Sequence, residues 1–223
     1  MTGFQADLEA VCELVHNKLS PHGRTVIGIA GPPASGKSTL AEAVVEKLNS
    51  DGDSGKFPTA ALVPMDGYHL DNDVLRAKGL FDRKGAPETF DSEGFCAAVH
   101  RLSTTTAELF FPRFDRGLDM SIANALSIHP ETPIVVVEGN YLLLDSAPWS
   151  ALKDDFAASV FVAPALEKLR DRLLQRWIDH DLNAEAALRR ANSNDLPNAE
   201  KILQESTKAD LILRQESLSE TAN

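Results

Sequence analysis

The stretch GPPASGKS, residues 31–38, constrains the fold of this chain more than any other part of the sequence. It matches the pattern G-x-x-x-x-G-K-[S/T], in which glycines let successive backbone N–H groups turn inward toward phosphate oxygens. The apolar run TVIGIA (Thr25–Ala30) precedes it and is typical of a central parallel strand. Leu40 and Val44 follow at helical spacing, so a helix is expected from Lys37. This strand–loop–helix context predicts a phosphate-binding loop.

The residues of the loop have defined tasks toward a nucleotide. The helix N-terminus adds partial positive charge, Lys37 is expected to reach the β- and γ-phosphates, and the Ser38 hydroxyl is a ligand for Mg²⁺. A nucleotide with Mg²⁺ is therefore the expected ligand. ATP is expected in place of GTP, because the look-alikes of a guanine-reading motif (TKAD) and of a switch motif (DSEG) stand in the wrong structural context. The residues expected to bind it are Gly31, Pro32, Pro33, Ala34, Ser35, Gly36, Lys37, Ser38 and Thr39.

Four further apolar runs are interpreted as strands, and helical segments separate them. They lie at 59–66, Ile134–Val137, Ala158–Ala163 and Ala209–Leu213. Five short strands alternating with helices predict an α/β fold of the P-loop NTPase type, with a doubly wound, mainly parallel sheet flanked by helices. Of two other segments, AELFFPRF is a candidate strand, and MSIANALSI is ambiguous between strand and helix.

The expected helices follow from apolar spacing and from residues that begin helices. Residues 5–19 read as an N-terminal amphipathic helix with Leu19 on its apolar face. Asp91 offers an N-cap for a later helix. Pro164 is expected to occupy the first position of a long helix, with Trp177 on its inward face. Two shorter helices are expected to start at Asn183 and Pro197.

The composition argues against two classes of partner. A formal net charge of −11 disfavours a nucleic-acid or anionic-membrane surface, because both require clustered Lys and Arg. No apolar run approaches the ~20 residues of a membrane span, and the N-terminus lacks the pattern of a signal peptide. Cys12 and Cys96 show no metal-binding spacing and are expected to be reduced packing residues. We expect a cytoplasmic protein with no nucleic-acid or membrane partner; a homo-oligomer is compatible with the sequence.

Two acids stand at the ends of predicted strands. Asp66 closes the run LVPMD, and Glu138 closes the run IVVVE. In an open parallel sheet such groups project beside the phosphate loop. One acid could orient the hydroxyl of an acceptor while the other holds Mg²⁺, and the sequence leaves open which does which.

Five motifs occur in an order that resembles the phosphoribulokinase/uridine kinase/pantothenate kinase family. They are GPPASGKS, MDGYHLDN, RKGAPETFD, FPRFDR and VVVEGNYLLL, and the likeness runs from about Val26 to Leu213. It is strongest to the bacterial branch labelled fructose transport system kinase. The resemblance implies a single P-loop kinase domain over 1–223, with an acceptor-binding region at about 66–128 and a helical lid at about 164–206.

The resemblance also assigns roles to individual residues. Asp66 takes the position of the catalytic base, and Glu138 contributes with Ser38 to the Mg²⁺ site. Arg172 and Arg176, four residues apart on one helix, are expected to close over the phosphates beside Lys37. The candidate contacts to the acceptor are Tyr68, His69, Arg83, Lys84, Glu88, Asp91, Arg113 and Phe114.

The expected function is an ATP- and Mg²⁺-dependent kinase that phosphorylates an alcohol of a small molecule. A sugar or sugar-like acceptor of the fructose type is favoured, because carboxylates such as Glu88 and Asp91 commonly bind polyols. Pantothenate, a nucleoside and a phosphosugar are the alternatives within the same class. In a different class, a nucleotide-binding regulatory protein with little kinase activity would also keep the phosphate loop.

Overall fold

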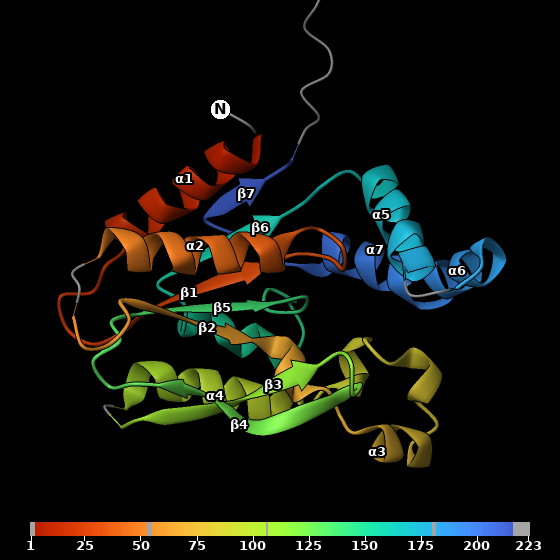
Figure 1. Cartoon of the computed structure of the whole chain (residues 1–223), viewed down its shortest axis with the longest axis horizontal. Coiled ribbons are helices and arrows are strands. Elements are labelled where there is room, and N and C mark those ends of the chain that lie inside the picture. The colour runs from red at the N-terminus through yellow and green to blue at the C-terminus, as the bar shows by residue number, and fades with distance from the viewer. Residues whose placement is uncertain (1–2, 53–54, 106, 180–181, 216–223) are drawn as a thin grey trace, which may run out of the picture.

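The computed structural model describes residues 3–52, 55–105, 107–179 and 182–215. Its main sheet has five parallel strands in the order β2-β5-β1-β6-β7 (Figure 1). The strands are β1 (Thr25–Ala30), β2 (Ala60–Pro64), β5 (Ile134–Gly139), β6 (Ala158–Val162) and β7 (Leu211–Leu213). The predicted parallel α/β sheet is confirmed, with the strand before the phosphate loop at its centre.

Strand β2 lies at the edge of the sheet, and this explains its proline. Pro64 is its last residue and lies opposite Glu138 of β5 in the strand register. A proline lacks the N–H needed for pairing on both sides, so an edge position tolerates it. The same register places the end of β2 beside the end of β5, so Asp66 and Glu138 lie near each other at the carboxyl ends of these two neighbouring strands.

Helices cover both faces of the sheet (Figure 1). Helices α1 (Gly3–Asn17) and α2 (Lys37–Asp51) pack on one face, against Ile27 and Ile29. Helix α4 (Ser92–Thr104) packs on the other face, in a cluster with Val26 and Ala30. Neighbouring residues of β1 thus point to opposite cores, as in any strand buried on both faces.

A separate antiparallel hairpin extends the second core. It consists of β3 (Leu109–Asp115) and β4 (Met120–Ile128), with an irregular register between Phe111 and Arg113. Leu109 and Phe111 are buried in the cluster that contains α4. The segment that the sequence left ambiguous is therefore the strand β4. Its partner β3 carries most of the FPRFDR motif and lies against the turn after β2, where the Pro112 carbonyl approaches Gly67.

The helices of the predicted lid region stand at one end of the sheet (Figure 1). They are α5 (Leu166–Asp179), α6 (Ala184–Arg190) and α7 (Leu196–Glu205), with a π-helical turn at Ala191–Asp195. Leu173, Ala191 and Leu196 form a small core of their own. Asn183 caps α6 as predicted, because its side chain accepts a hydrogen bond from the N–H of Ala186.

Several helix boundaries predicted from the sequence were wrong by one or two residues, and the helix expected to start at Pro197 begins at Leu196. Helix α1 ends at Asn17, and Leu19 lies beyond it with 46% of its surface exposed. Helix α5 begins at Leu166, so Pro164 precedes the helix instead of occupying its first position. Such errors arise because helix ends depend on local hydrogen bonds that apolar spacing does not encode.

Short helical segments complete the described chain. Helix α3 spans Asn72–Ala77, and 3-10 turns span Met65–Tyr68, Phe81–Arg83, Pro87–Thr89 and Trp149–Asp154. In the part of the chain that the structure describes, every helix is too short or too polar to cross a membrane.

Candidate active site

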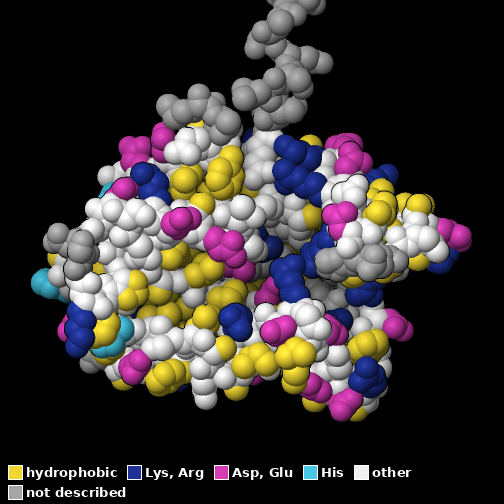
Figure 2. Space-filling model, viewed as in Figure 1, with side chains coloured by type: hydrophobic (Ala, Val, Ile, Leu, Met, Phe, Trp, Pro, Cys, Tyr) yellow, Lys and Arg dark blue, Asp and Glu magenta, His cyan; other side chains and the backbone are white. Residues whose placement is uncertain are grey.

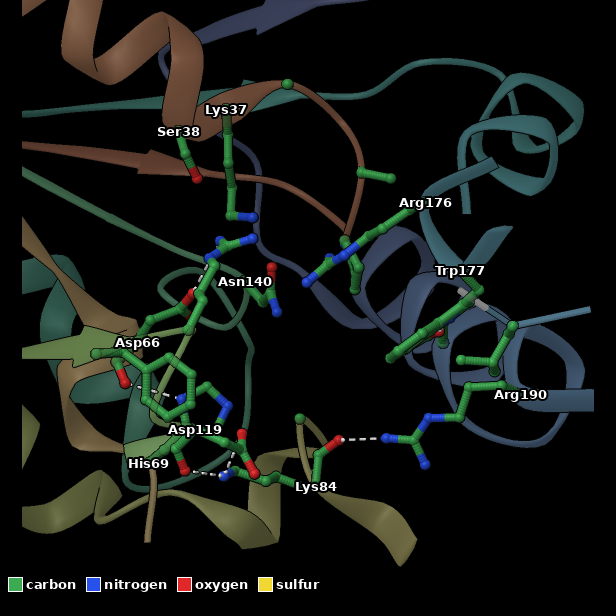
Figure 3. Close-up of a pocket in the computed structure, with 18 of the residues that line it drawn as sticks. Lys37, Ser38, Asp66, His69, Lys84, Asp119, Asn140, Arg176, Trp177 and Arg190 are labelled. Carbon is green, nitrogen blue, oxygen red and sulfur yellow. Dashed lines mark hydrogen bonds and ion pairs between the residues drawn. The ribbon is translucent and has the colours of Figure 1, made fainter. Parts of the chain in front are cut away.

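A cavity of about 740 Å³ opens between the phosphate loop, the end of β2, the β3–β4 hairpin and the lid. Figure 2 shows Lys and Arg side chains gathered in this hollow. Figure 3 shows Lys37, Asp66, His69 and Arg176 facing it from different elements. The predicted site residues that line it are Pro33, Ala34, Gly36, Lys37, Ser38, Thr39, Asp66, His69, Lys84, Phe114 and Arg176.

The phosphate loop has the backbone that its sequence predicted. Gly36 precedes α2 with φ 89°, in the left-handed region that glycine enters without strain. Ala34 also has a positive φ, of 62°. Lys37 is buried at the start of the helix, and its backbone N–H donates to the Ser35 hydroxyl over 3.4 Å. A backbone of this kind can turn N–H groups toward an anion, and Figure 3 shows the Lys37 side chain extending into the cavity.

The two acids at the strand ends occupy different environments. The Asp66 side chain is one-third exposed and lines the cavity. Glu138 is buried, and its Oε2 accepts a hydrogen bond from the Ser38 hydroxyl over 3.2 Å. Burial raises the pKa of Glu138 to about 7, a rise that the Lys37 charge opposes and the Asp66 charge adds to. The accessible acid and the buried acid are thus already distinguished before any ligand binds.

Ser38 and Glu138 form an oxygen pair suited to Mg²⁺. Among the described residues, no group of three or more His, Cys, Asp or Glu side chains could hold a metal ion. Mg²⁺ in phosphoryl-transfer sites needs fewer protein ligands, because waters and substrate phosphates complete its octahedron. A hydroxyl and a carboxylate beside the phosphate loop therefore fit this ion.

His69 has a defined protonation pattern. Its Nδ1 lies 2.8 Å from the backbone carbonyl of Asp66, and a carbonyl can only accept, so Nδ1 carries the proton. Burial lowers the pKa of the imidazole, an effect that the charge of Asp66 opposes. The neutral ring has Nε2 as an acceptor, and it packs against Phe114 at 4.6 Å between ring centroids. This edge of the cavity can accept a hydrogen bond from a hydroxyl.

Five predicted acceptor residues do not line the cavity. Asp91 is the N-cap of α4 and accepts from the N–H of Gly94 over 3.0 Å. The pair formed by Arg83 and Glu88 is half-exposed, with 3.1 Å between its charged atoms. The residues that the structure leaves outside the cavity lining are Tyr68, Arg83, Glu88, Asp91 and Arg113. Their roles toward an acceptor stay predictions.

Lys84 reaches the cavity wall but is already held there. Its ammonium group donates to the Asn72 side chain over 2.7 Å and to the Asp119 carboxylate over 2.8 Å. Only 11% of the side chain is exposed. These bonds join the segment after α3 to the turn of the β3–β4 hairpin (Figure 3). Lys84 thus fixes the shape of the wall.

The two lid arginines point to different partners. Arg172 donates to the carbonyls of Ala34 and Ser35 over 3.2 and 3.1 Å, so it holds the phosphate loop from outside. Arg176 lines the cavity (Figure 3). Burial lowers the pKa of Arg176, and the charge of Arg116 lowers it further. The helix brings both residues to the loop, but only Arg176 faces the space for the ligand.

The helices of the predicted lid also bond to the predicted acceptor-binding region. Arg190 donates to the backbone carbonyl of Asp82 over 2.8 Å and to that of Lys84 over 3.4 Å, and Figure 3 shows Arg190 beside Lys84. Asn194, in the π-helical turn, donates to the carbonyl of Lys84 over 3.0 Å. These bonds close the far side of the cavity by linking segments more than a hundred residues apart in the chain.

Sequence reasoning missed several residues of the cavity wall. They are Phe81, Asp82, Arg116, Asp119, Asn140, Trp177, Arg190 and Asp195. Arg116 and Asn140 belong to motifs that were recognised, FPRFDR and EGNYLLL, so their position in those motifs was the available signal. Trp177 carries no such signal: its helical spacing suggested a core residue, but it also faces the ligand space, where its Nε1 donates to Asp195 over 2.5 Å.

The fold and the site together define a P-loop phosphotransferase. The structure resembles that of a protein from Silicibacter sp. TM1040 described as a "putative fructose transport system kinase", with a TM-score of 0.85 and 43% identity over 92% of this chain and 98% of that one. No protein-family model matches the chain.

Two curated relatives show to which family of P-loop phosphotransferases the chain belongs. A Schizosaccharomyces pombe protein named "Putative uridine kinase C227.14" is 30% identical over 86% of this chain and 83% of its own length. The pantothenate kinase of Corynebacterium diphtheriae is also 30% identical, over 77% of this chain and 54% of its own length, so the chain spans about half of that enzyme. The chain belongs to the uridine kinase/pantothenate kinase family of P-loop kinases, as its motifs predicted.

Proposed function

We propose that this protein transfers the γ-phosphoryl group of ATP to an alcohol of a small polar acceptor, with a sugar or sugar-like molecule as the favoured acceptor. One observation carries the proposal. Asp66 follows β2, and Glu138 is the next-to-last residue of the neighbouring strand β5. An accessible acid and a buried acid therefore lie near Lys37, where we expect the phosphates to bind.

The different environments of the acids support a division of roles. Asp66 faces the cavity, where it can accept the proton of the acceptor hydroxyl. Glu138 is buried against Ser38, and the two would hold Mg²⁺, which supplies neutralising charge to the phosphates when bound. In the transfer, the bond from the acceptor oxygen to the γ-phosphorus forms. The bond from that phosphorus to the bridging oxygen breaks, and ADP leaves.

The preference for a sugar-like acceptor rests on the wall opposite the phosphate loop and on one similar structure. His69 offers a neutral nitrogen acceptor, and Phe114 packs beside it as an apolar surface. A ring or chain with several hydroxyls fits this combination, because an apolar face and hydrogen-bonding edges are both present. The similar structure from Silicibacter carries the word fructose in its description. Pantothenate, nucleosides and phosphosugars are the competing acceptors.

An acceptor screen tests the proposal. ATP consumption with Mg²⁺ is measured against sugars, nucleosides, pantothenate and phosphosugars, and one class should stimulate turnover. With that acceptor, Asp66→Asn should lower turnover by about 10²–10⁴ while nucleotide affinity is retained. Near-wild-type turnover in this variant would refute the role of Asp66 as base. Indifference to every acceptor would instead favour a nucleotide-binding regulatory protein.

A further inference from the structure

Arg116 enters the cavity from the β3–β4 hairpin, apart from both the phosphate loop and the lid. It directly follows β3, and the backbone around it is fixed because the Asp115 carboxylate accepts from the N–H groups of Gly117 and Leu118, each over 3.0 Å. The hairpin turn is tied again through Asp119 to Lys84. The position of Arg116 is therefore set by the fold, while 60% of its side chain is exposed.

The guanidinium group of Arg116 has a loose partner. Its Nη2 lies 3.6 Å from Oδ2 of Asp66, which is too long for a hydrogen bond. Ion pairs of this kind between partly exposed groups contribute little to stability. Arg116 can therefore leave Asp66 for a better anion at small cost. A phosphate oxygen offers shorter, charge-assisted and bidentate hydrogen bonds.

Three cations from three different parts of the chain meet around the same space. Lys37 comes from the phosphate loop, Arg176 from the lid and Arg116 from the hairpin, and all line the cavity. The pKa of Arg176 is lowered first by burial and next by the charge of Arg116, so the two guanidinium groups repel each other. Such a gathering is favourable once a polyanion binds between the groups.

We propose that Arg116 is a catalytic residue: when ATP binds, its guanidinium group leaves the Asp66 carboxylate, binds the γ-phosphoryl group and stabilises that group during transfer. The inference rests on the proposed kinase function and deepens it. When ATP binds, the exchange frees the carboxylate of Asp66 to accept the proton of the acceptor hydroxyl. Arg116 stays protonated and binds the non-bridging oxygens of the γ-phosphoryl group during its transfer, as arginines do in other phosphoryl-transfer sites.

The exchange predicts that Arg116 senses the third phosphate. Calorimetric titrations with Mg²⁺ would compare ADP with a non-hydrolysable β,γ-imido analogue of ATP. Arg116→Ala should weaken binding of the analogue by about 10- to 100-fold, the range for hydrogen bonds to a charged group. Affinity for ADP should change by no more than about twofold. Arg116→Lys keeps the charge without the bidentate geometry, so its affinity for the analogue should lie between those of the wild type and Arg116→Ala.

Arg76→Ala is the matched control, because Arg76 is an exposed arginine on α3 paired to one carboxylate, that of Asp73, at 2.8 Å. It should bind both nucleotides as the wild type does. If Arg116→Ala keeps the wild-type ratio of analogue affinity to ADP affinity, the inference is overturned. Arg116 would then be assigned to binding an anionic group of the acceptor. Equal weakening of both nucleotides would overturn it as well. A wild-type protein that binds neither nucleotide would instead overturn the proposed function, and this inference with it.

Discussion

Replacing Glu138 by Gln should make the protein without ligand more stable, by an amount that grows with pH. The side chain is 5% exposed, and burial raises its pKa from the ordinary 4.5 to about 7. A carboxylate that must lose its proton in such a place destabilises the folded state. Glutamine keeps an oxygen that can accept from Ser38 but carries no charge to desolvate.

The magnitude follows from proton linkage. Between pH 4.5 and 7 the folded protein binds more protons than the unfolded chain, so the free energy of unfolding falls as the pH rises. Each unit of pKa difference corresponds to about 1.4 kcal/mol, so the full effect of Glu138 is about 3 kcal/mol above pH 7. Most of it develops above pH 5. The stability advantage of Glu138→Gln should thus grow by about 2–3 kcal/mol from pH 5 to pH 8.

Urea unfolding in EDTA measures this difference directly, for wild type and variant at the same series of pH values. Glu131→Gln, which changes an exposed glutamate on the loop before β5, should show no such trend. Parallel curves for wild type and Glu138→Gln would refute the reasoning, as would a wild type that is the more stable at pH 8. Adding Mg²⁺ and ATP should reverse the order, because the carboxylate then has a cation beside it.

Four further substitutions test the site and its surroundings. Lys37→Ala should abolish the rise in melting temperature caused by ATP, and a full rise at saturating ATP would contradict the role of the loop. Gly67→Ala should destabilise the protein by about 1–3 kcal/mol in urea, because the new Cβ would lie 2.3 Å from the carbonyl oxygen of Pro112; unchanged stability would show that the hairpin can shift freely. Arg176→Ala should lower turnover more than nucleotide affinity, whereas Arg172→Ala should loosen the loop and lower affinity, and kinetic and binding measurements that give the reverse pattern would exchange the two roles.

The parts of the fold that the sequence predicted well are those with strong local signals. Strand β1 is buried along its whole length and is apolar after Thr25, so its pattern and its flanking loop sufficed. Strand β4 gave no clear signal, because most of Met120–Ile128 is exposed or only half-buried and no alternation results. A hairpin whose outer strand covers little core cannot be recognised from apolar spacing alone.

The candidate site shows the same division. Asp66 and Glu138 were predicted because each ends an apolar run in the sequence, which is a local feature. Lys84 looked equally suited to bind an acceptor, but its partner Asp119 lies 35 residues further along the chain. Residue type shows that a side chain can bind an anion, and only the fold shows whether another part of the protein already supplies one. The distinction between Arg172 and Arg176 has the same origin.

The bonds from Arg190 and Asn194 to the backbone of residues 82–84 have a consequence for how the two substrates affect each other's affinity. The lid that carries Arg176 shares a small core with the segment that makes these bonds. We expect both ATP and the acceptor to bind more tightly to this arrangement of the lid. Binding of either ligand then stabilises the arrangement that the other ligand prefers. Thermodynamic linkage requires the effect to be mutual: ATP should raise the affinity for the acceptor by the same factor as the acceptor raises the affinity for ATP. The two substrates should bind synergistically although they need not touch before the transfer.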